Sequence, residues 1–303
     1  MPHAPLVIVN PTAGGGRALR AVPWLRERLG PRPEARFEIT RRAGDAESLA
    51  AGAAEGGHDR VIVVGGDGTV QEVVNGLLAA DRPPELGIVP LGSGNDLARS
   101  LGLPADPAPA WHAAIGSNTQ PLDVARARNG EGAERWFASA GGIGFDAQVA
   151  AAMTDRRGWQ AGRAGYLLTT LSELRRYSNR TISLTVDGAS SAHDVLLVAI
   201  ANGAYYGGGM RIAPEARPDD GMLDVCVVAD ISRLTAIRQL PNLYRGTHVH
   251  HPQVSMRTGR RVEVDGEPST RIHLDGEPFG TLPLKVSLAP AALQVAVPAA
   301  RPA

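Results

Sequence analysis

The chain is 303 residues long, and its 31 Lys and Arg residues balance its 31 Asp and Glu residues. This length allows one large domain or two ordinary ones, and the charge balance gives no sign of bulk attraction to nucleic acid. The single cysteine, Cys226, excludes an internal disulfide, which fits a reducing cytosol. The sequence has neither a signal-peptide pattern nor an apolar run of the ~20 residues that a membrane-spanning helix needs. We therefore expect a cytoplasmic protein that at most rests on the inner face of a membrane.

Strand and helix patterns alternate over roughly the first 125 residues. The predicted strands are Leu6–Asn10, Phe37–Thr40, Val61–Val64 and Leu86–Pro90. The helix after the first strand should bury Leu19, Val22, Leu25 and Leu29. Asp45 should cap the helix after the second strand. This alternation predicts a parallel sheet with helices on both faces and ligands bound at the carboxyl ends of its strands.

The third strand leads into the glycine turn Gly65-Gly66-Asp67-Gly68-Thr69, and a helical pattern follows at once. A helix N-terminus presents free backbone N–H groups and the positive end of the helix dipole, which together favour phosphate. The glycines let the backbone approach a ligand closely, and Asp67 would suit a cation that accompanies the phosphate. Because the only lysine, Lys285, lies far from any glycine turn, we predict a nucleotide site without a P-loop.

A second turn of the same kind, Ser93-Gly94-Asn95-Asp96, follows the fourth strand. These residues are also typical of an ordinary helix N-cap. Asp67, Asp96 and Asp123 follow three separate strand-like segments, so they could meet at one edge of the sheet. Three carboxylates there would repel one another unless a cation joined them.

Strand patterns dominate after Asp123, beginning with a polar hairpin-like segment at Arg126–Arg135. The predicted strands are Trp136–Ala140, Thr181–Val186, Val195–Ala201, Leu223–Val228, Arg261–Val264, Arg271–Leu274 and Leu282–Leu288. The turns expected between strands include Asp187-Gly188, Asp265-Gly266 and Asp275-Gly276. Helices are expected near Ala164–Tyr177 and Leu234–Tyr244. We predict an α/β domain over residues 1–125, which residues 289–303 could complete, and an antiparallel β-sandwich domain over residues 126–288.

A set of motifs in this chain resembles the diacylglycerol kinase catalytic-domain family, in its soluble bacterial lipid-kinase branch. The motifs are VNPTAGGGR (Val9–Arg17), VVGGDGTVQEVVNGL (Val63–Leu77), GIVPLGSGNDLARSLGLP (Gly87–Pro104), ANGAYYGGGMRIAPEARPDDGMLDV (Ala201–Val225) and LDGEPFG (Leu274–Gly280). GGDG alone is shared with NAD kinases and phosphofructokinases, whereas GGDGT together with GSGNDLAR and a late LDGE is highly specific. The resemblance implies an N-terminal doubly wound α/β nucleotide-binding domain, a C-terminal antiparallel β-sandwich and an active site in the cleft between them.

The resemblance also implies that ATP and Mg²⁺ are used to phosphorylate a lipid hydroxyl, as in phospholipid biosynthesis. The nucleotide would be bound by Asn10, Pro11, Thr12, Thr40, Gly65, Gly66, Asp67, Gly68, Thr69, Glu72, Asn75, Ser93, Gly94 and Asn95. For Glu72 and Asn75 a solvated helix face is an equally good interpretation, and the residues at the strand ends also suit ordinary turns.

Two sets of metal ligands follow from the same resemblance. Asp67, Asp96 and Asp123 match the acidic positions that hold the catalytic Mg²⁺ network. A second, structural metal would be bound by the side chain of Asp220 and the backbone carbonyls of Arg217 and Met222. An ordinary acidic β-turn explains this second loop nearly as well.

The family places its general base in the LDGE hairpin, which makes Glu277 the candidate here, with Asp275 beside it as a catalytic residue. Phosphoryl transfer to a lipid needs a carboxylate that accepts the proton of the attacking hydroxyl. Asp265-Gly266-Glu267 repeats the tripeptide ten residues earlier. The flanking segments Ile272–Leu274 and Pro278–Gly280 match the family's context, so Glu277 is preferred.

Other features support weaker inferences. His248, His250 and His251 have metal-like spacing but no fourth ligand nearby, so we do not expect a zinc site. A helix at Tyr166–Arg176 should pack on the β domain. The residues before it that could touch an anionic membrane are Arg156, Arg157, Trp159 and Arg163. An exposed β edge could pair two chains as a homodimer.

Two further functions are compatible with parts of the pattern: phosphorylation of a soluble nucleotide, as in NAD kinases, and noncatalytic sensing of a nucleotide or lipid. The lipid cannot be chosen from sequence, because diacylglycerol, a sphingoid base, phosphatidylglycerol and an isoprenoid alcohol all present a hydroxyl on an apolar body.

Overall fold

The computed structural model describes residues 5–30, 35–155, 169–170, 172–175, 177 and 179–299. The chain divides into two compact units, each with its own hydrophobic core. Unit 1 comprises Met1–Val124 and Pro290–Ala303, and unit 2 comprises Ala125–Ala289. Within the described residues, every helix is too short or too polar to cross a membrane.

Unit 1 contains a parallel sheet with the strand order β2-β1-β3-β4. The strands are β1 (Leu6–Val9), β2 (Arg36–Ile39), β3 (Arg60–Gly65) and β4 (Glu85–Pro90). Strand β15 (Leu284–Ala296) reaches this sheet near its end, where Val295 pairs in parallel with Leu86 of β4. β1, β3 and β4 are almost entirely buried, as a sheet covered on both faces requires.

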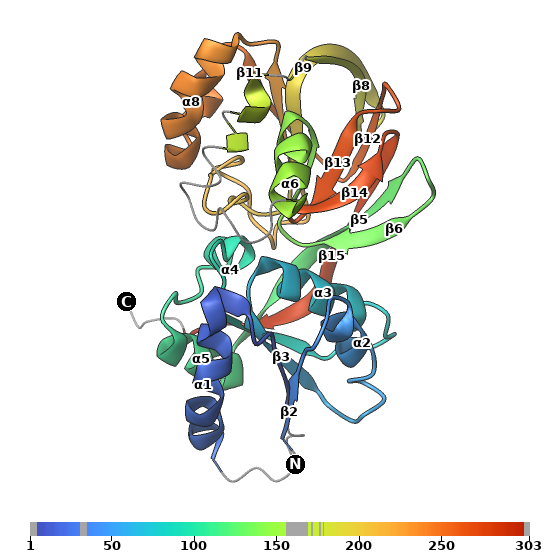
Figure 1. Cartoon of the computed structure of the whole chain (residues 1–303). Coiled ribbons are helices and arrows are strands. Elements are labelled where there is room, and N and C mark those ends of the chain that lie inside the picture. The colour runs from blue at the N-terminus through green and yellow to red at the C-terminus, as the bar shows by residue number, and fades with distance from the viewer. Residues whose placement is uncertain are drawn as a thin grey trace. The chain divides into compact units, whose positions relative to one another are not determined.

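Helices cover both faces of this sheet. They are α1 (Ala13–Leu29), α2 (Asp45–Ala51), α3 (Asp67–Leu77), α4 (Asp96–Ser100) and α5 (Pro107–Ile115). Figure 1 shows α1 and α5 on one side of the sheet and α2 and α3 on the other. The fully buried Trp111 of α5 belongs to the same core as Val7 and Ile62 of the sheet. The predicted α/β architecture is therefore confirmed.

Two predictions within unit 1 were wrong in detail. Leu19 of α1 is 46% exposed, and the smaller Ala18 is buried in its place. Asp45 does not cap α2: the N-cap is Gly44, and the Asp45 carboxylate accepts the N–H groups of Arg41 and Arg42 before the helix.

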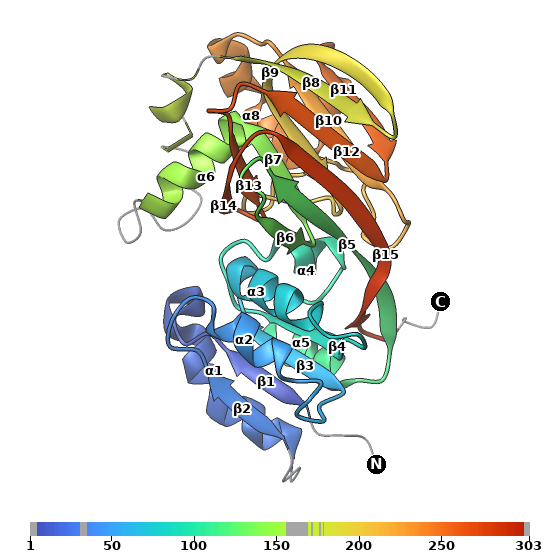
Figure 2. The ribbon, with the colours of Figure 1, turned by 90° about the vertical axis from the view of Figure 1, so that its right-hand side faces the viewer.

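Unit 2 is an antiparallel β structure with the strand order β14-β13-β7-β9-β8-β12-β15, and β10 joins β9 to β11. Its strands are β6 (Glu134–Phe137), β7 (Ala140–Gly144), β8 (Arg180–Val186), β9 (Ala189–Ala201), β10 (Leu223–Ala229), β11 (Val254–Gly259), β12 (Arg261–Gly266), β13 (Arg271–Leu274) and β14 (Glu277–Thr281). It also contains the second part of β5 (Thr119–Asn129), from Ala125 onward, and the first part of β15, up to Ala289. Figure 2 shows β9, β8 and β12 side by side. The expected antiparallel β unit is confirmed.

The apolar side chains of unit 2 form two cores on opposite faces of β9. Val198 and Ile200 lie in one core, and Ala199 and Ala201 lie in the other, as the alternation of side chains along a strand requires. The first core consists of residues from the strands and of Leu282, which lies between β14 and β15. The second lies beneath the helices α6 (Phe145–Asp155) and α8 (Arg233–Arg245) and the short 3-10 helix η1 (Thr247–His250).

Three predicted strand features of unit 2 need correction. The segment Trp136–Ala140 belongs to two strands, because β6 ends at Phe137 and β7 begins at Ala140. Asp265-Gly266 is not a turn, since Gly266 pairs with Ile182 within the β8–β12 ladder. The strand expected at Leu282–Leu288 belongs to β15, which continues to Ala296. In each case pairing with a distant strand, which local sequence does not reveal, decides where the strand ends.

The two other predicted turns and one of the two predicted helices are confirmed, and the second helix lies mostly outside the described residues. Both residues of Asp187-Gly188 and of Asp275-Gly276 have positive φ, as a type I′ hairpin turn requires. The helix near Leu234–Tyr244 is confirmed as α8. The helix near Ala164–Tyr177 falls mostly outside the described residues, which also exclude Arg156, Arg157, Trp159 and Arg163.

Candidate active site

Two glycine-containing loops of unit 1 touch at the carboxyl ends of the neighbouring strands β3 and β4. A Cβ added to Gly92 would lie 2.5 Å from Cα of Gly66, so only glycine allows this approach. The N–H of Leu91 donates to the carbonyl of Gly65 at 2.8 Å. The structure thus brings together the predicted phosphate-binding segments Gly65–Thr69 and Ser93–Asn95.

Asp67, the first residue of α3, joins the two loops. Its Oδ2 accepts the N–H of Asn95 at 2.7 Å, and its Oδ1 accepts the N–H of Asp96 at 2.6 Å. Burial raises the pKa of this carboxyl, although the two N–H donors and the guanidinium of Arg99 favour the charged form. A bound cation would favour the charged form further. Asp67 is therefore an anchor between the loops as well as a candidate metal ligand.

Asn10 connects the end of β1 to the same place. Its Nδ2 donates to Oγ1 of Thr69 at 2.9 Å, and its Oδ1 accepts the N–H of Thr12 at 3.1 Å and the hydroxyl of Thr12 at 2.9 Å. The N–H of Thr40, at the end of β2, donates to the carbonyl of Val9 at 3.0 Å. The predicted nucleotide ligands at the ends of β1 and β2 and at the start of α3 are thus neighbours, with Pro11 between Asn10 and Thr12.

Two other predicted nucleotide ligands make local contacts along α3. Oε2 of Glu72 accepts the N–H of Ala46 in the first turn of α2 at 3.2 Å. Nδ2 of Asn75 donates to the carbonyl of Gln71 at 2.9 Å. These contacts give both side chains a structural role, and their contact with a nucleotide stays a prediction.

The three aspartates predicted to hold Mg²⁺ lie in different surroundings. The backbone N–H of Asp96 donates to the Asp67 carboxylate. Asp123 is buried, and its Oδ1 accepts the N–H of Ala291 at 2.7 Å. In the part of the chain that the structure describes, no group of three or more His, Cys, Asp or Glu side chains is arranged to hold a metal. Asp67 fits Mg²⁺ best when phosphate oxygens and water supply the remaining ligands, as they commonly do for this ion.

The loop expected to hold a structural metal has an internal network of its own. Oδ1 of Asp220 accepts the N–H of Met222 at 3.0 Å, and the guanidinium of Arg217 binds Asp219 at 3.2 Å. Burial, together with the charges of Asp220 and Glu215, raises the pKa of the nearby Asp224 to about 6. The metal assignment of this loop stays a prediction.

In unit 2 the LDGE segment forms a hairpin between β13 and β14. The Asp275 carboxylate accepts the N–H groups of Ala138, Ser139 and Ala140 at 2.9 to 3.0 Å, which fixes the turn. Glu277 begins β14, directly after the turn. The repeated tripeptide differs, because Glu267 pairs with Arg180 and accepts the hydroxyl of Ser269 at 2.5 Å.

A buried pair that the sequence did not suggest supports the hairpin. Nε2 of His273 lies 3.4 Å from Oδ2 of Asp146 on α6, and Nδ1 of His273 accepts the N–H of Gly276 at 3.3 Å. Gly142 makes room for the pair, since a Cβ there would lie 2.0 Å from Oδ2 of Asp146. A chain of hydrogen bonds therefore runs from α6 to the turn that precedes Glu277.

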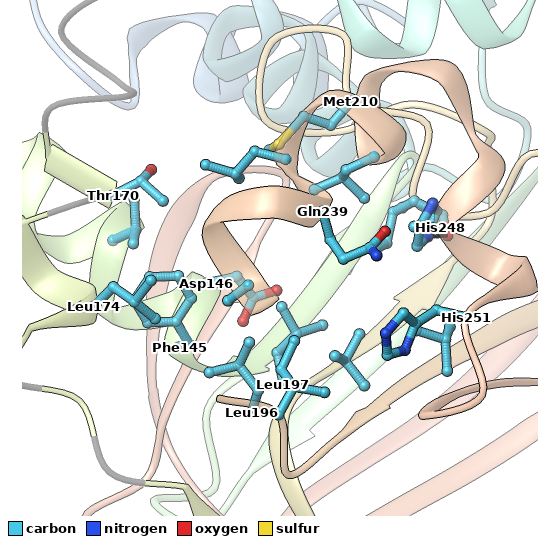
Figure 3. Close-up of a pocket in the computed structure, with 18 of the residues that line it drawn as sticks. Phe145, Asp146, Thr170, Leu174, Leu196, Leu197, Met210, Gln239, His248 and His251 are labelled. Atoms are coloured by element: carbon cyan, nitrogen blue, oxygen red, sulfur yellow. Dashed lines mark hydrogen bonds between the residues drawn. The ribbon is translucent and has the colours of Figure 1, made fainter. Parts of the chain in front are cut away.

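Asp146 also lines an apolar pocket of about 80 Å³. Figure 3 shows it with Phe145 and Leu174 toward one end and His248 and His251 toward the other. The wall is formed mainly by α6, β9, β10, α8 and η1. The pocket is thus lined mostly by hydrocarbon, with a carboxylate at one place on its wall.

His248 is another polar residue of that wall. Burial lowers its pKa, and Nε2 lies 3.1 Å from the carbonyl of Ile212. Nδ1 has no hydrogen-bond partner among the described residues. Sγ of the buried Cys226 lies 4.0 Å from Nε2 of His248, a distance that allows a hydrogen bond to sulfur.

Comparisons with known proteins decide the family. The model described as the diacylglycerol kinase catalytic domain matches residues 4–127, and the model described as the YegS C-terminal NAD kinase beta sandwich-like domain matches residues 139–297. A protein named diacylglycerol kinase from Mycobacterium tuberculosis is 36% identical over 294 residues, which cover 96% of this chain and 94% of that protein. The chain belongs to the diacylglycerol kinase family.

Further relatives agree with this assignment. A protein from Chromohalobacter salexigens named "Probable lipid kinase YegS-like" is 34% identical over 91% of this chain and 89% of that protein. A crystal structure of a diacylglycerol kinase from Bacillus anthracis has a TM-score of 0.75 and 25% identity, and covers 97% of each chain. As a member of the diacylglycerol kinase family with a catalytic kinase domain, the chain is an enzyme, and the expected fold class is confirmed.

The residues that sequence analysis missed in this diacylglycerol kinase family member are mainly those around the pocket. Asp146 follows the glycine-rich strand β7 and begins a helix turn, the same local signal that pointed to Asp67 and Asp96. His273 carried no signal, because its partner Asp146 lies 127 residues away in the chain and comes near it only in the folded unit.

Proposed function

We propose that this protein is a lipid kinase that transfers the γ-phosphate of ATP, with Mg²⁺, to a hydroxyl group of a lipid such as diacylglycerol. The observation that carries the proposal is the apolar pocket of unit 2, whose wall residue Asp146 is linked through His273 to the turn before Glu277. Relatives named diacylglycerol kinase support the same choice of substrate.

The lipid's hydrocarbon part would occupy the pocket. A volume of about 80 Å³ suits a segment of an acyl chain rather than the whole lipid. Its lining of Leu197, Met210 and Leu243, among others, offers a dinucleotide few polar partners. This composition favours a lipid over NAD, the acceptor of the related NAD kinases.

The nucleotide would be bound by the loops of unit 1. Backbone N–H groups of Gly65–Thr69 at the N-terminus of α3, and of Ser93 and Gly94 in the second loop, would receive the phosphates, since the N–H of Asn95 already donates to Asp67. Asp67 would hold Mg²⁺, with Asp96 and Asp123 supporting it, and the ion would neutralise charge that develops on the transferred phosphoryl group. Arg99, whose Nε donates to the carbonyl of Gly94 at 2.9 Å, stiffens the second loop.

Glu277 would accept the proton of the lipid hydroxyl as that oxygen attacks the γ-phosphate. Asp275 would hold the hairpin through its three backbone contacts, so we assign it a positioning role beside the base. The reaction site between the nucleotide and lipid domains stays a prediction, and so does the location in the cytoplasm.

A noncatalytic sensor is the alternative from another class. Such proteins usually lose a catalytic carboxylate or a glycine of the phosphate loop, and this chain retains Asp67, Glu277 and the glycines at 65, 66 and 68. An enzyme is therefore the better interpretation.

Filling the pocket should reduce activity selectively on long-chain lipids. Ala236 of α8 lines the pocket, and Ala236→Phe would place a ring where we expect the acyl chain. Each methylene that loses its burial costs about 0.8 kcal/mol, so excluding three should lower kcat/KM for long-chain diacylglycerol about 50-fold. The measurement is kcat/KM for long-chain and short-chain diacylglycerols with both proteins.

The short-chain substrate and ATP binding are internal controls, and both should be nearly unchanged in Ala236→Phe. Equal losses on both lipids would mean that the pocket does not hold the acyl chain. Activity on NAD in place of any lipid would transfer the assignment to the soluble-nucleotide alternative.

A further inference from the structure

We propose that the exposed face of α8 docks the protein on the surface of an anionic bilayer. The inference rests on the proposed function, because a kinase with a membrane lipid as its substrate has to reach that lipid at a membrane. The evidence lies in the residues of α8 (Arg233–Arg245), all of which the structure describes.

Two apolar side chains of α8 project into solvent. Leu234 is 56% exposed and Ile237 is 41% exposed, and in the described part of unit 2 they are the large hydrophobic residues with the greatest exposure. Their spacing of three residues places them on one side of the helix, and the exposed Pro241 continues the same stripe. An apolar stripe of this kind favours a partner that can receive hydrocarbon.

Arginines flank this stripe. Arg233, Arg238 and Arg245 are exposed, and α8 contains no Asp or Glu. The guanidinium of Arg233 donates to the carbonyl of Tyr177 at 3.3 Å. The acidic residue nearest in sequence, Asp230, lies before the helix and bonds to Asn179. Positive charge beside exposed hydrocarbon is the pattern of a helix that lies at an anionic membrane surface.

The opposite side of α8 lines the apolar pocket. Ala236, Gln239, Leu240 and Leu243 recur with the same helical periodicity and all contribute to the pocket wall. Figure 1 shows α8 at the outside of unit 2, where one side of the helix meets the rest of the unit. One helix therefore carries a membrane-facing surface and part of the proposed lipid site, so docking would bring the pocket to the layer that contains its substrate.

The test compares three proteins: the wild type, a double variant with Leu234→Glu and Ile237→Glu, and the control variant Leu19→Glu. Leu19 is a matched control, because it is a similarly exposed leucine on a helix of unit 1. Binding is measured by sedimentation with phosphatidylcholine vesicles that contain or lack phosphatidylglycerol. We expect the wild type and Leu19→Glu to prefer the anionic vesicles, and the double variant to bind them at least about 10-fold less well. Raising the salt concentration should weaken wild-type binding.

Kinase activity on a short-chain lipid in solution separates this proposal from the proposed function. The double variant should retain wild-type activity there, because neither residue lines the pocket. If vesicle binding depends on α8 but no lipid is phosphorylated, the kinase assignment is contradicted and the docking proposal still holds. Wild-type vesicle binding by the double variant, an equal loss in Leu19→Glu, or a dimer that dissociates when α8 is changed would overturn the docking proposal.

Discussion

Glu277→Gln should abolish most phosphoryl transfer while leaving ATP binding intact. Glutamine keeps the size of the side chain but cannot accept the proton of the lipid hydroxyl. General-base catalysis contributes about 10²- to 10⁴-fold, so kcat should fall by about that factor with little change in the affinity for nucleotide. Steady-state kinetics on the lipid substrate and a direct ATP-binding measurement give the two quantities.

The chain contains its own control for this experiment. Glu267 follows a second Asp-Gly pair, yet it lies in an exposed network with Arg180 and Ser269. Glu267→Gln should keep activity within about two-fold of the wild type, since exposed ion pairs of this kind contribute little. An unchanged kcat in Glu277→Gln, or a similar loss in Glu267→Gln, would mean that the base lies elsewhere.

Asp67→Asn should lower kcat/KM for ATP about 10²- to 10³-fold, the range found when one preorganised electrostatic contact to a transition state is removed. The substitution removes the charge that would hold Mg²⁺. It also weakens the junction between the loops, because the amide replaces one of the two oxygens that accept the N–H groups of Asn95 and Asp96. Kinetics over a range of Mg²⁺ concentrations measure the first effect, and Tm measures the second.

Asp45→Asn is the matched control, since Asp45 is also the first residue of a helix in unit 1 but is not among the proposed ligands. Its activity should equal that of the wild type. If Asp67 holds the metal, Asp67→Asn should need more Mg²⁺ for half-maximal activity. If the loss of activity instead parallels the fall in Tm and does not depend on the Mg²⁺ concentration, Asp67 only holds the two loops together and does not bind the metal.

The sequence predicted unit 1 well because its signals are local. The short apolar strands β1, β3 and β4 each end in a polar or glycine turn, and the carboxyl ends of parallel strands share one edge of a sheet. The contacts within that edge could not be predicted. Asp67 meets Asn95 across 28 residues of chain, and nothing near either residue in sequence specifies that hydrogen bond.

Unit 2 was less predictable because its pocket is assembled from distant segments. Phe145 on α6, Leu197 on β9 and Leu243 on α8 become neighbours only after the strands pair. Helix α6 was missed, since its run of alanines gives a weak apolar period. β14 was also missed: it is short and contains Pro278, which cannot donate a ladder hydrogen bond.

The proposed lipid kinase activity is tested most directly by measuring phosphoryl transfer with the purified protein. The donor is γ-labelled ATP with Mg²⁺, the acceptors are a panel of lipids in mixed micelles, and NAD is assayed in parallel. The panel contains diacylglycerol, a sphingoid base, phosphatidylglycerol and an isoprenoid alcohol. We predict that labelled phosphate appears on the hydroxyl group of a lipid and that none appears on NAD. Label in NAD, or ATP binding without transfer to any of these lipids, would contradict it.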